Sequence, residues 1–149
     1  MRAISAFIWL LLSYASSALA QVPQDFIANT VPKKYPQLVA YIKANGPQQI
    51  SWMTASKESQ SMRISLTKDN HLTIESQMYF GSASTASSTS ERTKVVMIDR
   101  KLDGKLDRLE ATPPGSRTQT VETPKDEGSS FLWYSALSIA FRQSPCCKN

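Results

Sequence analysis

The sequence predicts an α+β fold: an antiparallel meander sheet of four to five strands, with an N-terminal helix and a C-terminal helix packed on one face. Two observations support this prediction. Apolar residues recur at every second position through the middle of the chain, which is typical of strands with one wet face. Segments with helical apolar spacing flank that region on both sides. We expect these two helices to cover the apolar face of the sheet.

The first twenty residues have the pattern of a cleavable signal peptide. Arg2 precedes an apolar block, and Ala18-Leu19-Ala20 places small residues at the positions that signal peptidase reads. The block from Ala3 to Tyr14 spans 12 residues, whereas a membrane-spanning helix needs about 20. We therefore expect cleavage after Ala20, no transmembrane segment after cleavage, and a secreted or periplasmic location.

Removal of residues 1–20 would leave 149 − 20 = 129 residues, the usual size of one domain. The formal charge of +5 would become +4, because 16 basic and 12 acidic side chains remain. These basic residues are spread along the chain, whereas nucleic-acid-binding proteins usually cluster them. We therefore expect no nucleic-acid partner.

An N-terminal arm, residues 21–32, is expected to lead into a single domain, residues 33–143. The first helix of the domain is predicted over residues 33–45, followed by the stop signal Gly46-Pro47. Its core-facing residues recur at helical spacing: Leu38, Val39, Tyr41 and Ile42.

Strands are predicted where apolar residues alternate with polar ones: residues 49–56, 61–67, 71–80 and 93–98. Residues 81–92 are rich in Ser and Thr and contain little apolar surface, so we expect a flexible loop there. A long polar loop is predicted over residues 112–123. The C-terminal helix is expected to begin at Thr123-Pro124 and to run to about Gln143.

The last residues, 144–149, contain both cysteines, Cys146 and Cys147, and are expected to form a frayed tail. Because the chain has no third cysteine, no intramolecular disulfide can join distant segments. An intermolecular disulfide through Cys146 or Cys147 and a soft-metal site are the functional alternatives.

One segment, residues 99–110, resembles the calcium-binding loop of EF-hand proteins. Carboxylates fall at loop positions 1, 5, 9 and 12, and a glycine at position 6: Asp99, Asp103, Asp107, Glu110 and Gly104. The resemblance implies that these four carboxylates bind calcium together with the backbone carbonyl of Lys105. Lys101 departs from the pattern, because it places a cation at position 3, where an oxygen ligand is expected. The preceding segment also reads as a strand and not as a helix.

The same segment is also compatible with a plain hairpin. Asp103-Gly104 between two strand-like runs is typical of a two-residue turn. That turn would place Arg100 opposite Asp107 and Asp99 opposite Arg108, two complementary charge pairs. The agreement of these pairs on one register favours the hairpin over the calcium loop.

Other chemistry in the sequence is sparse. His71 is the only histidine, and its position after Asp69-Asn70 indicates a residue beside a turn. We expect no catalytic constellation and therefore favour an exported, non-enzymatic binding or structural module of unknown ligand. The alternatives are a calcium-binding module that uses residues 99–110, and a carboxylate-based hydrolase.

Overall fold

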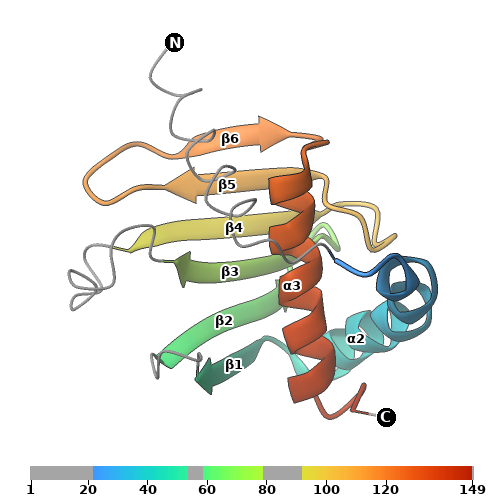
Figure 1. Ribbon diagram of the computed structural model, residues 1–149. Coiled ribbons are helices and arrows are strands. Elements are labelled where there is room, and N and C mark those ends of the chain that lie inside the picture. The colour runs from blue at the N-terminus through green and yellow to red at the C-terminus, as the bar shows by residue number, and fades with distance from the viewer. Residues whose placement is uncertain (1–21, 54–58, 79–91, 149) are drawn as a thin grey trace.

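The computed structural model describes residues 22–53, 59–78 and 92–148, and forms a sheet with helices packed against it (Figure 1). The predicted signal peptide, residues 1–20, and residues 81–91 of the Ser/Thr-rich segment lie outside the described residues.

The described strands form one antiparallel sheet in meander order, so the predicted topology and the α+β class are confirmed. The sheet has six strands, one more than the upper end of the predicted range. In order they are β1 (Gln48–Met53), β2 (Ser59–Leu66), β3 (Leu72–Met78), β4 (Thr93–Asp99), β5 (Arg108–Thr112) and β6 (Gln119–Glu122).

The alternating apolar residues lie on one face of this sheet, as predicted. Ile64 pairs with Ile74, and Ile74 in turn pairs with Met97, so their side chains form a continuous row across three strands. All three side chains are fully buried. The row continues through Leu109 on β5, and this apolar surface stabilises the fold because the helices remove it from water.

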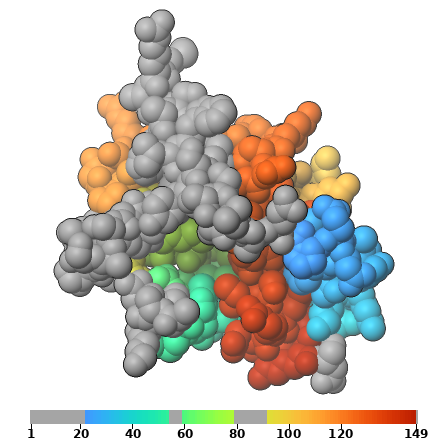
Figure 2. All heavy atoms as spheres, viewed as in Figure 1, coloured from blue at the N-terminus to red at the C-terminus, as the bar shows by residue number. Residues whose placement is uncertain are grey.

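Two helices cover this face. α3 (Glu127–Gln143) crosses the strands, and α2 (Val31–Asn45) packs beside α3 and against β2 (Figures 1 and 2). Trp133 of α3 and Tyr35 of α2 are both buried, with ring centroids 6.4 Å apart. Among the described residues, no helix is both long and apolar enough to cross a membrane.

The helices begin at residues other than those predicted. The region expected to be an arm contains a π-helical turn, η1 (Phe26–Thr30), that runs directly into α2. This segment packs against α3, with the ring centroids of Phe26 and Phe141 6.0 Å apart. At the start of α3 the N-cap is Asp126, whose side chain accepts a hydrogen bond from Ser129 N–H, and not Thr123.

The predicted long loop over residues 112–123 is partly wrong, because it contains β6. This strand is short and polar, so alternation in the sequence does not mark it. β6 is held by its partner β5: Leu109 pairs with Val121, and Arg108 pairs with Glu122.

The expectation of a frayed C-terminal tail is also wrong for residues 144–148. α3 ends at Gln143, and the chain turns back so that Cys147 enters the hydrophobic core, where it is 2% exposed. Cys146 and Cys147 are bonded to each other. The intermolecular disulfide considered from the sequence therefore does not fit this structure, because each sulfur already has its neighbour as partner.

Candidate functional site

The candidate site is the loop of residues 100–107, which connects β4 to β5 and is organised by Asp99. Asp99 is the last residue of β4 and is fully buried on the apolar side of the sheet. Its Oδ2 accepts hydrogen bonds from the Tyr35 hydroxyl at 2.6 Å and from Gly104 N–H at 2.8 Å. Its Oδ1 accepts from Lys101 N–H at 3.0 Å. One carboxylate thus joins α2 to both halves of the loop.

Gly104 is the point at which the loop touches the helices. Its φ of +82° lies in the left-handed region that glycine adopts without a side-chain clash. A Cβ at this position would lie 2.9 Å from Cγ1 of Val31. The Gly104 carbonyl accepts a hydrogen bond from Trp133 Nε1 at 2.8 Å. The loop is therefore fixed on both α2 and α3.

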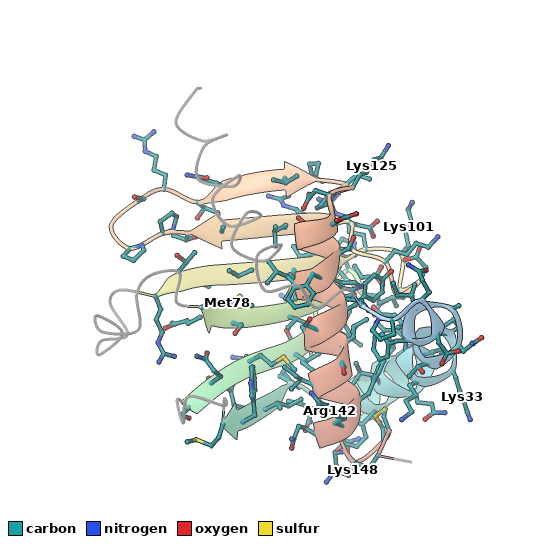
Figure 3. All side chains as sticks on the ribbon, in the orientation of Figure 1. Lys33, Met78, Lys101, Lys125, Arg142 and Lys148 are labelled. Carbon is teal, nitrogen blue, oxygen red and sulfur yellow. A yellow bond between two sulfur atoms is a disulfide. The ribbon has the colours of Figure 1, made fainter. Side chains whose placement is uncertain are left out.

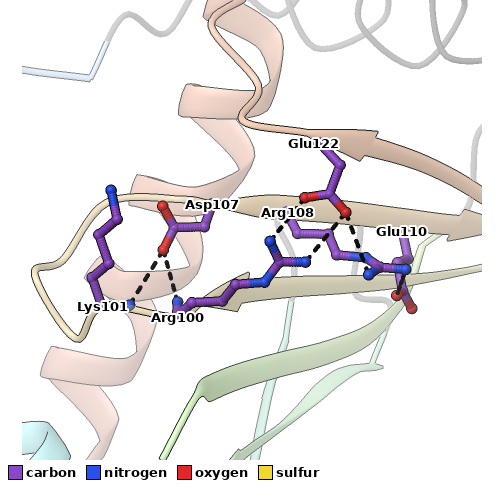
Figure 4. Close-up of polar contacts among 6 residues, drawn as sticks. All are labelled: Arg100, Lys101, Asp107, Arg108, Glu110 and Glu122. Carbon is purple, nitrogen blue, oxygen red and sulfur yellow. Dashed lines mark hydrogen bonds and ion pairs between the residues drawn. The ribbon is translucent and has the colours of Figure 1, made fainter.

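Two further carboxylates lie close to Asp99. One oxygen atom from each of Asp99, Asp103 and Asp107 lies within 4.8 Å of the others. Asp107 Oδ2 accepts from Arg100 N–H at 2.7 Å and from Lys101 N–H at 3.3 Å (Figure 4). Asp103 is exposed, and its Oδ1 accepts from Lys105 N–H at 3.0 Å. The structure thus brings together three of the four carboxylates singled out by the sequence.

The fourth predicted carboxylate, Glu110, is not part of this cluster. It lies on β5 and forms an ion pair with Arg108 at 2.9 Å. Arg108 also pairs with Glu122, which in turn binds Arg100 (Figure 4). These charges belong to the polar face of the sheet, whereas Asp99 faces the helices. Strand alternation separates Glu110 from the other three carboxylates.

The two-residue hairpin turn is also wrong. Met97 pairs with Leu109 and Ile98 with Arg108, a register shifted by one residue from the predicted pairing of Ile98 with Leu109. The predicted pairs of Arg100 with Asp107 and of Asp99 with Arg108 would have required Asp99 to face solvent. Two buried donors, the Tyr35 hydroxyl and Gly104 N–H, and the part-buried Lys101 N–H bond to the Asp99 carboxylate, which favours the observed register with a longer loop.

Burial is the largest cause of the raised pKa values of three groups near the loop. It raises the pKa of Asp99 above the ordinary aspartate value, and the hydrogen bonds from Tyr35 and Gly104 oppose the rise only in part. Burial, followed by the hydrogen bond to Asp99, raises the pKa of Tyr35 well above its ordinary range. Burial and the negative charge of Asp103 raise the pKa of Tyr134.

His71 has the structural position that the sequence predicts, beside a turn. Thr67 N–H donates to the His71 carbonyl at 2.9 Å, and His71 N–H donates to Thr67 Oγ1 at 3.1 Å. Asn70, inside this turn, has a φ of +59°. The backbone of His71 therefore closes the β2–β3 connection.

Sequence reasoning did not identify the role of Tyr35 and Trp133, the two helical residues whose hydrogen bonds hold the loop. Each reads as an apolar residue at helical spacing, which is typical of core. Their polar atoms offered the only signal: a buried tyrosine O–H or tryptophan N–H usually has a hydrogen-bond partner. That rule predicts a partner but does not identify which one.

No protein-family model, no curated protein and no solved structure matches this chain.

Proposed function

We propose that this protein is an exported, non-enzymatic binding or structural module that presents the loop of residues 100–107. The observation that carries the proposal is the complete use of the Asp99 carboxylate by Tyr35, Lys101 and Gly104. A buried carboxyl group with a raised pKa is often a general acid or base. Here it is fully buried and holds the loop on the helices, which supports a scaffolding role.

This arrangement gives the loop a fixed base and a charged outer surface. Lys101, Asp103 and Lys105 are exposed, whereas Gly104 between them is buried. Figure 3 shows Lys101 projecting outward from this end of the sheet. A rigid base with exposed charged side chains suits recognition of a ligand, because little conformational entropy is lost on binding.

Export and the absence of turnover can be tested together on the full chain expressed with its N-terminal segment. We expect the exported protein to begin at Gln21, as read by N-terminal sequencing, and to hydrolyse no ester, phosphate, glycoside or peptide substrate above background. Turnover that is lost in Asp103→Asn or in His71→Ala would contradict the non-enzymatic role. An intact Met1 on protein retained in the cytoplasm would contradict export.

Calcium binding is the second candidate, which we consider because Asp99, Asp103 and Asp107 lie close together. Calcium takes six to eight oxygen ligands, and Asp103 and Asp107 each have one carboxylate oxygen outside the hydrogen bonds described above. Both oxygens of Asp99 already accept hydrogen bonds. A site built mainly on two carboxylates would have a dissociation constant for calcium of about 10⁻³ M, in the weak range typical of extracellular modules.

A melting experiment tests this second candidate. If the dissociation constant is about 1 mM, then 5 mM calcium should stabilise the protein by about 1 kcal/mol relative to protein in chelator. We expect Asp103→Asn to abolish this shift while the melting temperature in chelator stays the same, because Asp103 is exposed.

Glu110→Gln is the matched control, since Glu110 pairs with Arg108 outside the cluster. It should retain the full calcium shift. An identical melting temperature of the unmodified protein in calcium and in chelator would reject calcium as the ligand.

A further inference from the structure

The C-terminal turn contains a disulfide that joins two neighbouring residues and therefore closes no loop between distant segments. The usual stabilisation by a disulfide comes from restricting such a loop in the unfolded chain, and it grows with loop length. The fold is held together by its buried core. We therefore expect the folded state to survive reduction of this bond.

The two sulfur-bearing residues have different surroundings. Cys147 is 2% exposed and belongs to the core cluster, whereas Cys146 is half-buried and packs at the margin of that cluster. Lys148, the next residue, is exposed and projects from the end of the chain (Figure 3). An attacking thiolate reaches an accessible sulfur faster than a buried one, so we expect the attack at Cys146 Sγ and not at Cys147 Sγ.

The surroundings of Cys147 are compatible with both the disulfide and the thiol form of this residue. Cys147 Sγ lies 3.9 Å from the Lys34 carbonyl oxygen. In the disulfide this sulfur has no proton to donate, whereas a Cys147 thiol would find that oxygen in place as an acceptor. Two contacts of the Cys147 backbone do not involve sulfur: Lys34 Nζ donates to the Cys147 carbonyl at 2.9 Å, and Cys147 N–H donates to the Ser144 carbonyl at 3.2 Å.

We propose that Cys146 and Cys147 form a reversible thiol–disulfide exchange site, which takes an external dithiol as its reductant. A thiolate of the dithiol attacks Cys146 Sγ, the Cys146–Cys147 bond breaks, and Cys147 leaves as a thiolate that takes a proton. The second thiolate of the dithiol then attacks the dithiol sulfur that is bonded to Cys146 Sγ. This bond breaks, and Cys146 leaves as a thiolate that takes the second proton. Two electrons and two protons pass to the protein, and the dithiol becomes a disulfide. This inference is independent of the function proposed for the loop.

The test compares the oxidised protein with protein treated with dithiothreitol in native buffer. Alkylation is read by mass spectrometry on the tryptic peptide of residues 143–148, which contains both cysteines. We expect no alkylation before reduction and two alkylated cysteines after it. The reduction rate should be independent of urea below the unfolding transition, and oxidised glutathione should restore the bond. A reduction rate that increases with urea in parallel with unfolding would overturn the proposal, as would free thiols in the oxidised protein.

Single-cysteine variants separate the two sulfurs. We expect Cys146 in Cys147→Ala to react with a thiol reagent at least about tenfold faster than Cys147 in Cys146→Ala, because thiol reactivity follows exposure. Each variant is compared under native conditions and again in denaturant, where the two rates should become equal. Equal rates in the folded variants would overturn the assignment of Cys146 as the attacked sulfur. If Cys147→Ala fails to fold, Cys147→Ser serves in its place.

Discussion

The Tyr35 hydroxyl and the Asp99 carboxylate are hydrogen-bonded at 2.6 Å in the interior, although 64 positions separate them in the chain. The pair joins α2 to the end of β4. Both groups are buried, where a hydroxyl or carboxylate without a hydrogen-bond partner is costly. The three-donor arrangement at Asp99 determines the path of the loop over residues 100–107.

Tyr35→Phe should lower the free energy of unfolding by about 1–3 kcal/mol, because it removes a donor from a buried carboxylate. Urea denaturation at pH 7 measures this change. Tyr41→Phe is the matched control, since Tyr41 is half-buried on the same helix, and its effect should be smaller. Equal effects of the two substitutions would show that the hydrogen bond to Asp99 contributes nothing specific.

The raised pKa of Asp99 predicts a definite pH dependence of stability. In the unfolded chain the carboxyl group has a pKa of about 3.9. Between that value and the higher folded pKa, the folded state holds a proton that the unfolded state has lost. The contribution of Asp99 to the free energy of unfolding is therefore fully present below the unfolded pKa. It is lost as the pH rises through the folded pKa.

Asp99→Asn removes this titration. It should also lower stability at pH 7 by about 1–3 kcal/mol, because the amide NH₂ must face the N–H of Gly104 or of Lys101. Urea denaturation from pH 4 to pH 7 tests both statements. A difference between the two proteins that stays constant over this range would contradict the raised pKa.

Gly104→Ala should be strongly destabilising, by about 2–4 kcal/mol, because it adds overpacking against Val31 to the cost of a positive φ. Gly115→Ala is the matched control: Gly115 has a φ of +66°, but an added Cβ would meet nothing within 4 Å. That variant should lose only about 1–2 kcal/mol. Thermal or urea denaturation of both variants gives the comparison.

A double-mutant cycle isolates the contact itself. Val31→Ala removes the atom that the new Cβ would meet, so Gly104→Ala should cost less in that background, by at least about 0.5 kcal/mol. Strict additivity of the two substitutions would show that the clash is relieved elsewhere.

The ion pairs on the polar face should contribute little. Glu122 is bound by both Arg100 and Arg108, but its side chain is 53% exposed. Glu122→Gln should change the free energy of unfolding by only about 0–1 kcal/mol, and less at high salt. Urea denaturation at low and high sodium chloride tests this. A larger loss that persists at high salt would assign these pairs a structural role that their exposure does not predict.

The sequence predicted the strand alternation well because a strand directs successive side chains to opposite faces. Ile64 and Ile74 could therefore be assigned to the buried face from local pattern alone, and both are buried. Met97 lies in a continuous apolar run without alternation, and only its pairing with Ile74 and Leu109 places it on that face. β6 was missed for the same reason: Gln119–Glu122 has no marked alternation, and only its pairing with β5 makes it a strand.

The candidate site was predicted only in part. The spacing of Asp99, Asp103 and Asp107 indicated three residues that do converge. Glu110 was grouped with them wrongly, because a linear motif does not record where a strand begins. β5 begins at Arg108 and directs the Glu110 side chain to the other face of the sheet.

The sequence by itself determined the fold class, the meander order between the two main helices and the buried face of the alternating strands, because these depend on periodicities that extend over a few neighbouring residues. Tertiary structure alone decided the β4–β5 register, the role of Asp99 and the docking of Cys147. Each of these requires contact with α2, at Tyr35 or Lys34, and a contact between distant residues depends on where the whole chain places them.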